Sequence, residues 1–389
     1  MPITRILIVD DEAVSRNLLR KALNEYESLE IVGSVSNCRL ALKKIPQVTP
    51  DIVVMDVDMP ETDVIQTVLE IRKSYPDLPV LMLCARKENK NAARVLQALA
   101  AGANDYIPKS RKPPEESETQ KEFSKEFFDK IRPFCLGPLI RKKPGLRESS
   151  TDLLPQAPEV SGNFFLENQV RQPVTQKTSE ESRANRVDIL AIGVSTGGPE
   201  ALSAVLSQLP ADFPVPIVIV QHMPPEFTDH LARSLNRKTP LFVKEAQDGD
   251  LLSPGTVFLA PGGRHMTVRP ENNRLLIRTH SGPPENSCRP AVDVLFRSVA
   301  EYFGSRTLAV VLTGMGQDGF LGSQKIHRSG GTIFVQDEPS SVVWGMPGAL
   351  ARSGLAGKVL PLQNVAQEII NRIWLGRSHS SYMPVKFIA

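Results

Sequence analysis

The sequence predicts two α/β domains, each built on a doubly wound parallel sheet, joined by a long flexible linker. In both halves of the chain, short apolar runs such as 6–9 and 308–312 alternate with segments of helical spacing. This alternation is typical of parallel sheets whose strands are connected by helices. Between the halves, residues 133–185 are rich in Pro, Ser, Gln, Lys and Glu, a composition that buries too little apolar surface to fold. The expected parts are a first domain at 1–132, a linker at 133–185, a second domain at 186–378 and a tail at 379–389.

Composition excludes several classes of protein. A net charge of +3 is small for 389 residues, so no nucleic-acid-binding surface is indicated. No apolar run is long enough to cross a bilayer and the first residues lack a secretory cleavage pattern, so we expect a cytoplasmic protein without membrane insertion. Four cysteines lie far apart without a C-x-x-C pair, which argues against a disulfide framework or a zinc site.

Polar side chains follow the predicted strands of the first domain. The strands are expected at 6–9, 31–35, 52–55 and 80–83, and the helices at 14–23, 41–45, 92–101 and 115–132. In a parallel sheet the ligand site lies beyond the carboxyl ends of the strands. The residues found there are Asp10, Asp11, Asp56, Cys84 and Lys109. Three neighbouring carboxylates favour a hard divalent cation such as Mg²⁺, and a lysine beside them favours a phosphoryl group.

The second domain shows the same alternation. Strands are expected at 189–194, 215–220, 256–259, 275–278, 308–312 and 332–335, and helices at 201–206, 227–235, 291–303 and 322–328. After the first of these strands, residues 193–197 match G-x-S-x-G, which places the Ser195 hydroxyl at a sharp turn into a helix. The motif leaves two interpretations open: a nucleophile, or a Gly-rich turn that binds phosphate with Ser195 capping the helix.

Two further residues favour the nucleophile. His222 and Asp318 each follow another apolar strand, so they are expected at the same sheet edge as Ser195, where a base and an orienting acid are needed. Glycines around Met315 would let its backbone N–H face a developing oxyanion. His265 also follows a strand and is a rival for the base. The order Ser, His, Asp differs from that of the α/β-hydrolases, in which the acid precedes the histidine.

The first domain resembles a response-regulator receiver domain, on the strength of its strand-end residues and the segment from Gly102 to Lys109. The resemblance implies a flavodoxin-like fold in which a sensor histidine kinase phosphorylates Asp56. It also implies that Asp10, Asp11 and Asp56 hold Mg²⁺, that Lys109 contacts the phosphoryl group and that Tyr106 is the aromatic switch residue. Cys84 stands where the family usually has Ser or Thr, and a thiol is a weaker hydrogen-bond donor.

The second domain resembles the catalytic domain of the chemotaxis protein-glutamate methylesterases. The motifs that carry the resemblance are Gly193-Val-Ser-Thr-Gly-Gly-Pro199, Gln221-His-Met-Pro224, Ala260-Pro-Gly-Gly-Arg-His265, Arg289-Pro-Ala-Val-Asp-Val-Leu-Phe296 and Thr313-Gly-Met-Gly-Gln-Asp-Gly319. It implies a Rossmann-like domain that hydrolyses glutamyl methyl esters on methylated chemoreceptors, releases methanol and deamidates receptor glutamines. The implied triad is Ser195, His222 and Asp318, with the Met315 amide in the oxyanion hole and no cofactor for the hydrolysis.

The resemblance also implies that the unphosphorylated receiver covers the active-site edge and that phosphorylation relieves this block. Two other functions remain compatible with the residues alone. One is a receiver-controlled serine esterase or amidase that acts outside chemotaxis. The other is a non-enzymatic adaptor whose partner binding depends on phosphorylation.

Overall fold

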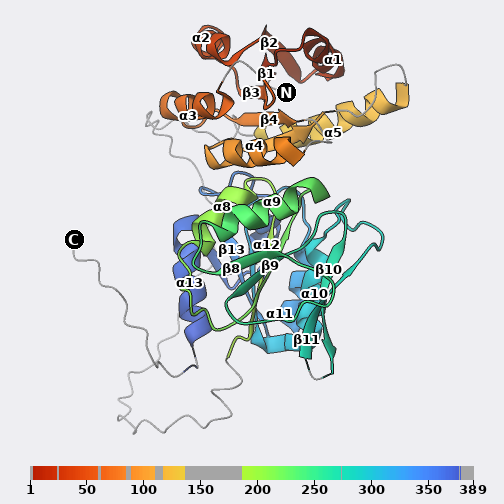
Figure 1. Cartoon of the computed structure of the whole chain (residues 1–389), viewed down its shortest axis with the longest axis vertical. Helices are drawn as coiled ribbons and strands as arrows, with labels where there is room; N and C mark the ends of the chain where they lie inside the picture. The colour runs from red at the N-terminus through yellow and green to blue at the C-terminus, as the bar shows by residue number, and fades with distance from the viewer. Residues whose placement is uncertain are drawn as a thin grey trace, which may run out of the picture.

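The structure, a computed structural model, describes residues 3–23, 26–59, 63–84, 89–109, 117–135, 186–272, 274–375 and 377. Figure 1 shows an N-terminal α/β unit stacked on a larger C-terminal one. The expected linker lies outside the described residues from 136 onward, and the expected tail lies outside them entirely.

The N-terminal unit is a five-stranded sheet with the order β2-β1-β3-β4-β5. All neighbouring strands pair in parallel. This is the strand order of flavodoxin-like folds, so the predicted fold class is confirmed. The strands are β1 (Thr4–Val9), β2 (Leu29–Val35), β3 (Ile52–Asp56), β4 (Val80–Cys84) and β5 (Asp105–Pro108).

Helices cover both faces of this sheet. Apolar residues of α1 and α5 form one buried cluster with the strands, and those of α2, α3 and α4 contribute to another. Phe127 and Ile131 of α5 are fully buried because residues four apart share one helix face. The α5 helix also ends three residues beyond the predicted end at 132. The helices are α1 (Ala13–Leu23), α2 (Cys38–Val48), α3 (Val64–Ser74), α4 (Asn89–Ala100) and α5 (Ser117–Cys135).

The C-terminal unit has a seven-stranded parallel sheet with the order β14-β13-β12-β6-β7-β9-β8. One expectation was wrong, because the strand predicted at 275–278 does not join this sheet. It belongs to β11, which pairs antiparallel with β10 in a separate hairpin. The strands are β6 (Ile189–Val194), β7 (Ile217–Gln221), β8 (Phe242–Glu245), β9 (Thr256–Leu259), β10 (His265–Glu271), β11 (Arg274–His280), β12 (Thr307–Val311), β13 (Thr332–Gln336) and β14 (Lys358–Leu360).

Two apolar layers enclose the seven-stranded sheet. Helices α8, α9 and α13 pack on one face, in a cluster that continues into the N-terminal unit, while α10, α11, α12 and the hairpin pack on the other. The helices are α8 (Gly198–Leu206), α9 (Pro225–Asn236), α10 (Val292–Phe303), α11 (Phe320–Arg328), α12 (Met346–Arg352) and α13 (Leu362–Trp374), with a short 3₁₀ turn at Gly304–Arg306. Among the described helices, none has both the length and the apolar content needed to span a bilayer.

Helices α10 and α11 approach each other so closely that their contact requires a glycine. A Cβ atom added at Gly322 of α11 would lie 2.5 Å from Phe296 Cβ and 3.1 Å from Asp293 O on α10. Because this contact is tighter than real Cβ atoms allow, a methyl group would force the two helices apart.

We therefore expect Gly322→Ala to lower the free energy of unfolding by about 1–3 kcal/mol, measured by urea denaturation followed by circular dichroism. Gly357→Ala is the matched control, since its added Cβ would come no closer than 3.3 Å to Ile333 O. Equal losses in the two variants would contradict the close packing of α10 on α11.

Candidate active site

Ser195 lies directly after β6, at the turn into α8. Gly197 has a left-handed φ of +79° and is the N-cap residue of α8, so the interpretation of Ser195 as the helix cap is wrong. The glycine permits a backbone conformation that side chains with a Cβ rarely adopt. Pro199 then occupies the first turn of the helix, where its missing N–H costs nothing. The turn leaves Ser195 half-buried.

The backbone of Ser195 is held from three sides. Its N–H donates to Thr313 O at 3.0 Å, and its carbonyl accepts from Gly198 N at 2.8 Å. The same carbonyl accepts from Gln221 Nε2 at 2.9 Å. Gln221 is buried and also donates to His222 O at 3.2 Å. This one amide therefore fixes the nucleophile candidate relative to the histidine, a role that the sequence did not reveal.

His222 follows β7 and pairs with Asp318. Its Nε2 lies 2.7 Å from Asp318 Oδ2, and its Nδ1 lies 3.5 Å from Cys288 Sγ. Burial of the imidazole lowers its pKa, but the hydrogen bonds with Asp318 and Cys288 outweigh burial and raise the pKa of His222 to about 9. These two contacts therefore favour the protonated form of the ring in this conformation.

The Asp318 carboxylate lies at the N-terminus of α10. Its Oδ2 accepts from Val292 N at 2.6 Å, and its Oδ1 accepts from Asp293 N at 3.0 Å and Gly319 N at 2.9 Å. The Val292 and Asp293 N–H groups belong to the first turn of α10 and have no acceptor within the helix, and the helix dipole favours an anion there. Burial acts to raise the pKa of Asp318, but His222 and the backbone donors hold it below its ordinary value. The acid is therefore kept ionised.

A second buried carboxylate, that of Asp293, lies next to Asp318. Asp293 is 1% exposed, and its Oδ1 accepts from Gly322 N at 2.6 Å. Asn286 Nδ2 bridges the two acids, donating to Asp293 Oδ2 at 3.1 Å and to Asp318 Oδ1 at 2.9 Å. Burial raises the pKa of Asp293. Neither residue was singled out from the sequence, although Asp293 lies in one of the motifs that carry the family resemblance.

A cavity of about 650 Å³ opens over these residues, and both units of the chain line it. The C-terminal unit contributes Ser195, His222 and Met315, so the structure brings three of the predicted site residues to one surface. Gly314, just before Met315, is anchored by donating to Val343 O at 2.9 Å and accepting from Met346 N at 2.8 Å. The N-terminal unit contributes Tyr106, Pro108, Lys125, Asp129 and Lys130.

His265, the rival for the base, makes structural contacts instead. It is 1% exposed, its Nδ1 accepts from Ala291 N at 3.2 Å, and its Nε2 lies 2.9 Å from Pro283 O. Both ring nitrogens are therefore engaged by the backbone of the loop before α10. Unlike His222, His265 does not line the cavity that contains Ser195.

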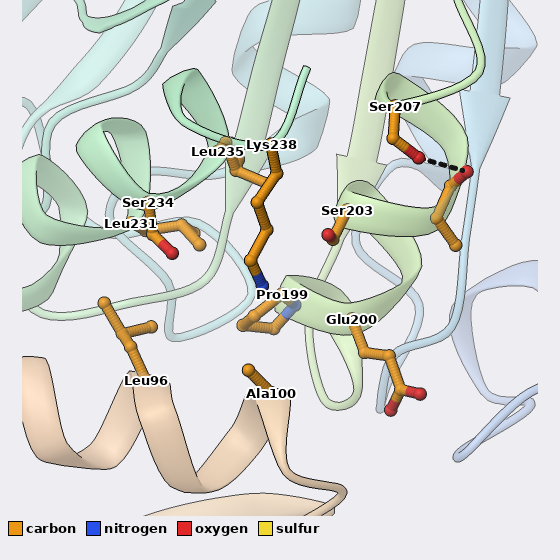
Figure 2. Close-up of a pocket in the computed structure, with 11 residues that line it drawn as sticks. Leu96, Ala100, Pro199, Glu200, Ser203, Ser207, Leu231, Ser234, Leu235 and Lys238 are labelled. Atoms are coloured by element: carbon orange, nitrogen blue, oxygen red, sulfur yellow. Dashed lines mark hydrogen bonds between the residues drawn. The ribbon is translucent and has the colours of Figure 1, made fainter.

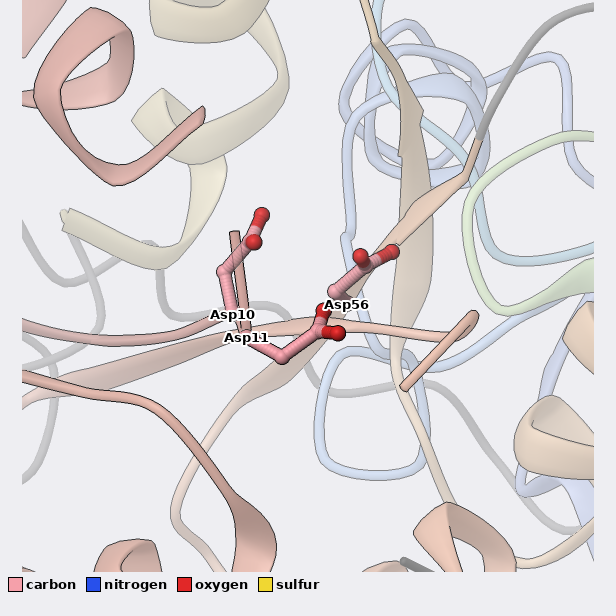
Figure 3. Close-up of side chains that lie close together, drawn as sticks. All are labelled: Asp10, Asp11 and Asp56. Carbon is pink, nitrogen blue, oxygen red and sulfur yellow. The ribbon is translucent and has the colours of Figure 1, made fainter. Parts of the chain in front are cut away.

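An acidic cluster lies at the carboxyl edge of the N-terminal sheet (Figure 3). Asp10, Asp11 and Asp56 each offer a carboxylate oxygen, and these oxygens lie within 4.8 Å of one another. Lys109 Nζ lies 2.6 Å from Asp56 Oδ2 and 3.1 Å from Asp10 Oδ2. Burial raises the pKa of Asp56, and the charge of Lys109 only partly offsets this rise. Burial acts to lower the pKa of Lys109, but Asp56 and Asp10 outweigh it and raise that pKa. These oxygen donors suit a hard divalent cation.

The other two candidate residues of the N-terminal unit face different surroundings. Cys84 is fully buried, and its Sγ donates to Ile107 O at 3.9 Å. Tyr106 is 5% exposed, and its ring stacks on that of Phe227 in α9 with centroids 4.8 Å apart. Tyr106 therefore belongs to the contact between the two units.

That contact reaches the residue next to Ser195. Thr196 Oγ1 donates to Asp105 Oδ2 at 2.7 Å, and the same oxygen accepts from Lys130 Nζ at 3.0 Å. Both Thr196 and Asp105 are buried. Beside this polar contact, Leu96 and Ala100 of α4 face Pro199 of α8 and residues of α9 across a crevice of about 230 Å³ (Figure 2).

Comparison with known proteins identifies both units. Residues 190–369 match the family model for CheB methylesterase, and residues 6–118 match that for the response regulator receiver domain. A protein-glutamate methylesterase/protein-glutamine glutaminase from Trichodesmium erythraeum is 44% identical over 96% of this chain and 100% of its own length. One of the same name from a Nocardioides species is 41% identical over 99% of both chains. A solved structure, the CheB methylesterase catalytic domain of Thermotoga maritima, is 42% identical with a TM-score of 0.47, covering 48% of this chain and 98% of that one.

A substitution of Asn286 tests whether its side-chain amide, which bridges Asp293 and Asp318, helps Asp318 to orient His222. Because Asn286 has a left-handed φ of +52°, we choose Asn286→Gly, which keeps this backbone conformation. We expect the kcat of ester hydrolysis to fall about tenfold, since Asp293 and Asp318 would then repel each other without a shared donor.

Ser287→Gly is the matched control, because Ser287 has a φ of +61° in the same turn. Steady-state kinetics should leave this control near the wild-type rate. Similar losses in both variants would mean that the turn acts through its backbone alone.

Proposed function

The chain belongs to the protein-glutamate methylesterase/protein-glutamine glutaminase family, and we propose that it hydrolyses glutamyl methyl esters on chemoreceptors in response to phosphorylation. The observation that carries this proposal is the juxtaposition of Ser195 and His222 in one cavity, with Asp318 bonded to His222 at 2.7 Å. We assign Ser195 as nucleophile, His222 as base and Asp318 as the acid that orients it.

In the proposed first step, Ser195 Oγ attacks the carbonyl carbon of the methyl ester and its proton passes to His222 Nδ1. We assign Nδ1 to this step because Asp318 holds Nε2, and the Cys288 thiol that contacts Nδ1 would have to yield it. The carbonyl π electrons move onto oxygen, where we place the Met315 N–H as donor. Collapse of this intermediate breaks the bond to methoxide, which takes the proton from His222 and leaves as methanol. Water then hydrolyses the acyl-serine by the same sequence.

The same residues support deamidation of receptor glutamines. The acyl group is identical once the first bond is broken, so only the leaving group differs, ammonia in place of methanol. His222 would protonate that nitrogen as it leaves. The carboxylate product is the same glutamate, and the proposed role of both reactions is adaptation in chemotaxis signalling.

We further propose that a histidine kinase phosphorylates Asp56. When Mg²⁺ is bound, Asp10, Asp11 and Asp56 would hold it, and the ion would neutralise charge on the incoming phosphoryl group. Lys109, already 2.6 Å from Asp56, would pair with the phosphoryl oxygen. The two carboxylate contacts of Lys109 that would be rearranged, with Asp56 and Asp10, both lie just beyond the end of β5.

Strand β5 supports a route from Asp56 to the active site. Lys109 follows its last residue, and Asp105 is its first. Asp105 accepts from Thr196, the neighbour of Ser195, while Tyr106 stacks on Phe227. A four-residue strand therefore joins the phosphorylation site to the contact beside the nucleophile. We propose that this contact keeps the receiver over the cavity until Lys109 changes partner.

A receiver-controlled esterase or amidase acting outside chemotaxis would use the same residues on another substrate. Incubation with methylated chemoreceptor separates the two functions, since only the chemotaxis enzyme would release methanol from it. A non-enzymatic adaptor would release none.

Ser195→Ala should abolish methanol release from methylated receptor, lowering kcat by at least about 10⁴-fold because the covalent step is lost. Methanol is measured with and without a small-molecule phosphodonor. Ser305→Ala, at an exposed serine of the 3₁₀ turn Gly304–Arg306, is the control and should keep the wild-type rate. Full activity of Ser195→Ala would overturn the triad.

Asp105→Ala tests receiver control from the receiver side, without altering the catalytic unit. We expect the unphosphorylated rate of methanol release to rise about tenfold, because the charge-assisted hydrogen bond to Thr196 favours the closed form. The rate with phosphodonor should stay near that of wild type.

Asp51→Ala is the matched control, because Asp51 accepts from Arg5 N within the receiver. If Asp105→Ala leaves the unphosphorylated rate unchanged, the Asp105–Thr196 contact does not restrain the enzyme. If Asp51→Ala activates equally, general loosening of the receiver is responsible.

A further inference from the structure

The base nitrogen that Ser195 needs already has a partner. Nε2 of His222 is engaged by Asp318 at 2.7 Å, so Nδ1 carries the lone pair of the neutral ring. Among the described residues, the group bonded to this Nδ1 is the Cys288 thiol, whose Sγ lies 3.5 Å away. Cys288 is half-buried and lines the same cavity as Ser195.

One short turn positions this thiol and the Asn286 amide together. Glu285 and Cys288 exchange backbone hydrogen bonds, with N–O distances of 3.1 and 2.8 Å. Asn286 and Ser287 between them both have left-handed φ values. The turn therefore contacts both members of the acid–base pair: Asn286 donates to Asp318, and Cys288 contacts His222. The fixed backbone places the thiol within reach of His222, and the contact can be broken by rotation of the Cys288 side chain.

We propose that Cys288 is a positioning residue that shares a proton with His222 Nδ1 and sets the pH at which this base can accept the proton of Ser195. The inference rests on the proposed role of His222 as base. As a thiol, Cys288 donates S–H to the Nδ1 lone pair; as a thiolate, it accepts N–H from the imidazolium. In both forms the lone pair is occupied. The S–H···Nδ1 bond must break, or the proton must return to sulfur, before Nδ1 can take the proton from Ser195 Oγ.

The other charged groups around His222 are distributed on several elements. Asp318 contacts the ring and Asp293 lies behind it, while Lys125, Asp129 and Lys130 of α5 line the cavity opposite. Arg289 follows Cys288 and lines the cavity as well. Burial lowers the pKa of His222, and Asp318 and then Cys288 oppose burial by hydrogen bonding. Loss of the thiol therefore moves this pKa downward while the Asp318 contact remains.

The experiment compares full-length wild type, Cys288→Ala and Cys288→Ser. Saturating phosphodonor is present throughout, so that the receiver is phosphorylated to the same extent in all three proteins. We measure kcat/KM for methanol release across the pH range. The wild-type kcat/KM should rise with pH, and the midpoint of this rise should lie at lower pH in both variants. At a pH below the midpoint, each pH unit by which the midpoint falls raises kcat/KM about tenfold, because a tenfold larger fraction of His222 is unprotonated. Cys135→Ala, at a half-buried cysteine of α5, should match wild type.

A second readout follows His222 without catalysis. In protein with ¹⁵N-labelled histidine, the ring nitrogen shifts of His222, assigned with His222→Gln, should titrate at lower pH in Cys288→Ala than in wild type. An unmoved titration midpoint overturns the proposal, as does a kcat/KM that falls by one factor at every pH, which is the result expected if the thiol only packs. If Ser195→Ala stays active, the triad fails, yet the nitrogen shifts still decide whether the thiol and imidazole are paired.

Discussion

The Asp318 carboxylate at the N-terminus of α10 is the interaction on which the catalytic unit depends. Three backbone N–H groups, an amide and an imidazole converge on its two oxygens. A buried carboxylate without such donors would take up a proton rather than stay ionised. Helix α10 supplies two of the backbone donors, Val292 N and Asp293 N, because its first turn has no internal acceptors for them. The close packing of α11 on α10 at Gly322 fixes the N-terminus of α10. This helix end holds Asp318, and Asp318 in turn holds His222.

The active site also contains more ionisable groups than a minimal triad. Asp293 and Asp318 share one amide donor, and His222 lies between an acid and a thiol. In such a cluster the proton on one group affects the protonation of the next. The protonation of His222 therefore depends on Asp318 at Nε2 and Cys288 at Nδ1, and the turn at 285–288 contacts the first through Asn286 and provides the second.

Much of the fold and the main site residues could be predicted because parallel sheets follow a simple rule. Residues after the strands meet at one edge, and this rule alone predicts that Ser195, His222 and Asp318 lie together. The β10–β11 hairpin broke that rule, because apolar alternation does not distinguish parallel from antiparallel pairing. Asn286 was missed because its function depends on a left-handed turn and two distant partners. The contact of Asp105 with Thr196 joins residues 91 positions apart, and no local pattern specifies such a pair.

The hydrogen bond from Thr196 to Asp105 also bears on how such a chain can evolve. A receiver that was joined to its output domain only by a tether could be exchanged for another receiver. Here a carboxylate oxygen of the receiver accepts a hydrogen bond from the residue next to Ser195, and the rings of Tyr106 and Phe227 stack in the same contact between the units. A receiver taken from another protein would keep an acidic cluster like that of Asp10, Asp11 and Asp56 yet lose this fit. The contact therefore constrains both surfaces, because a change on one requires a compensating change on the other.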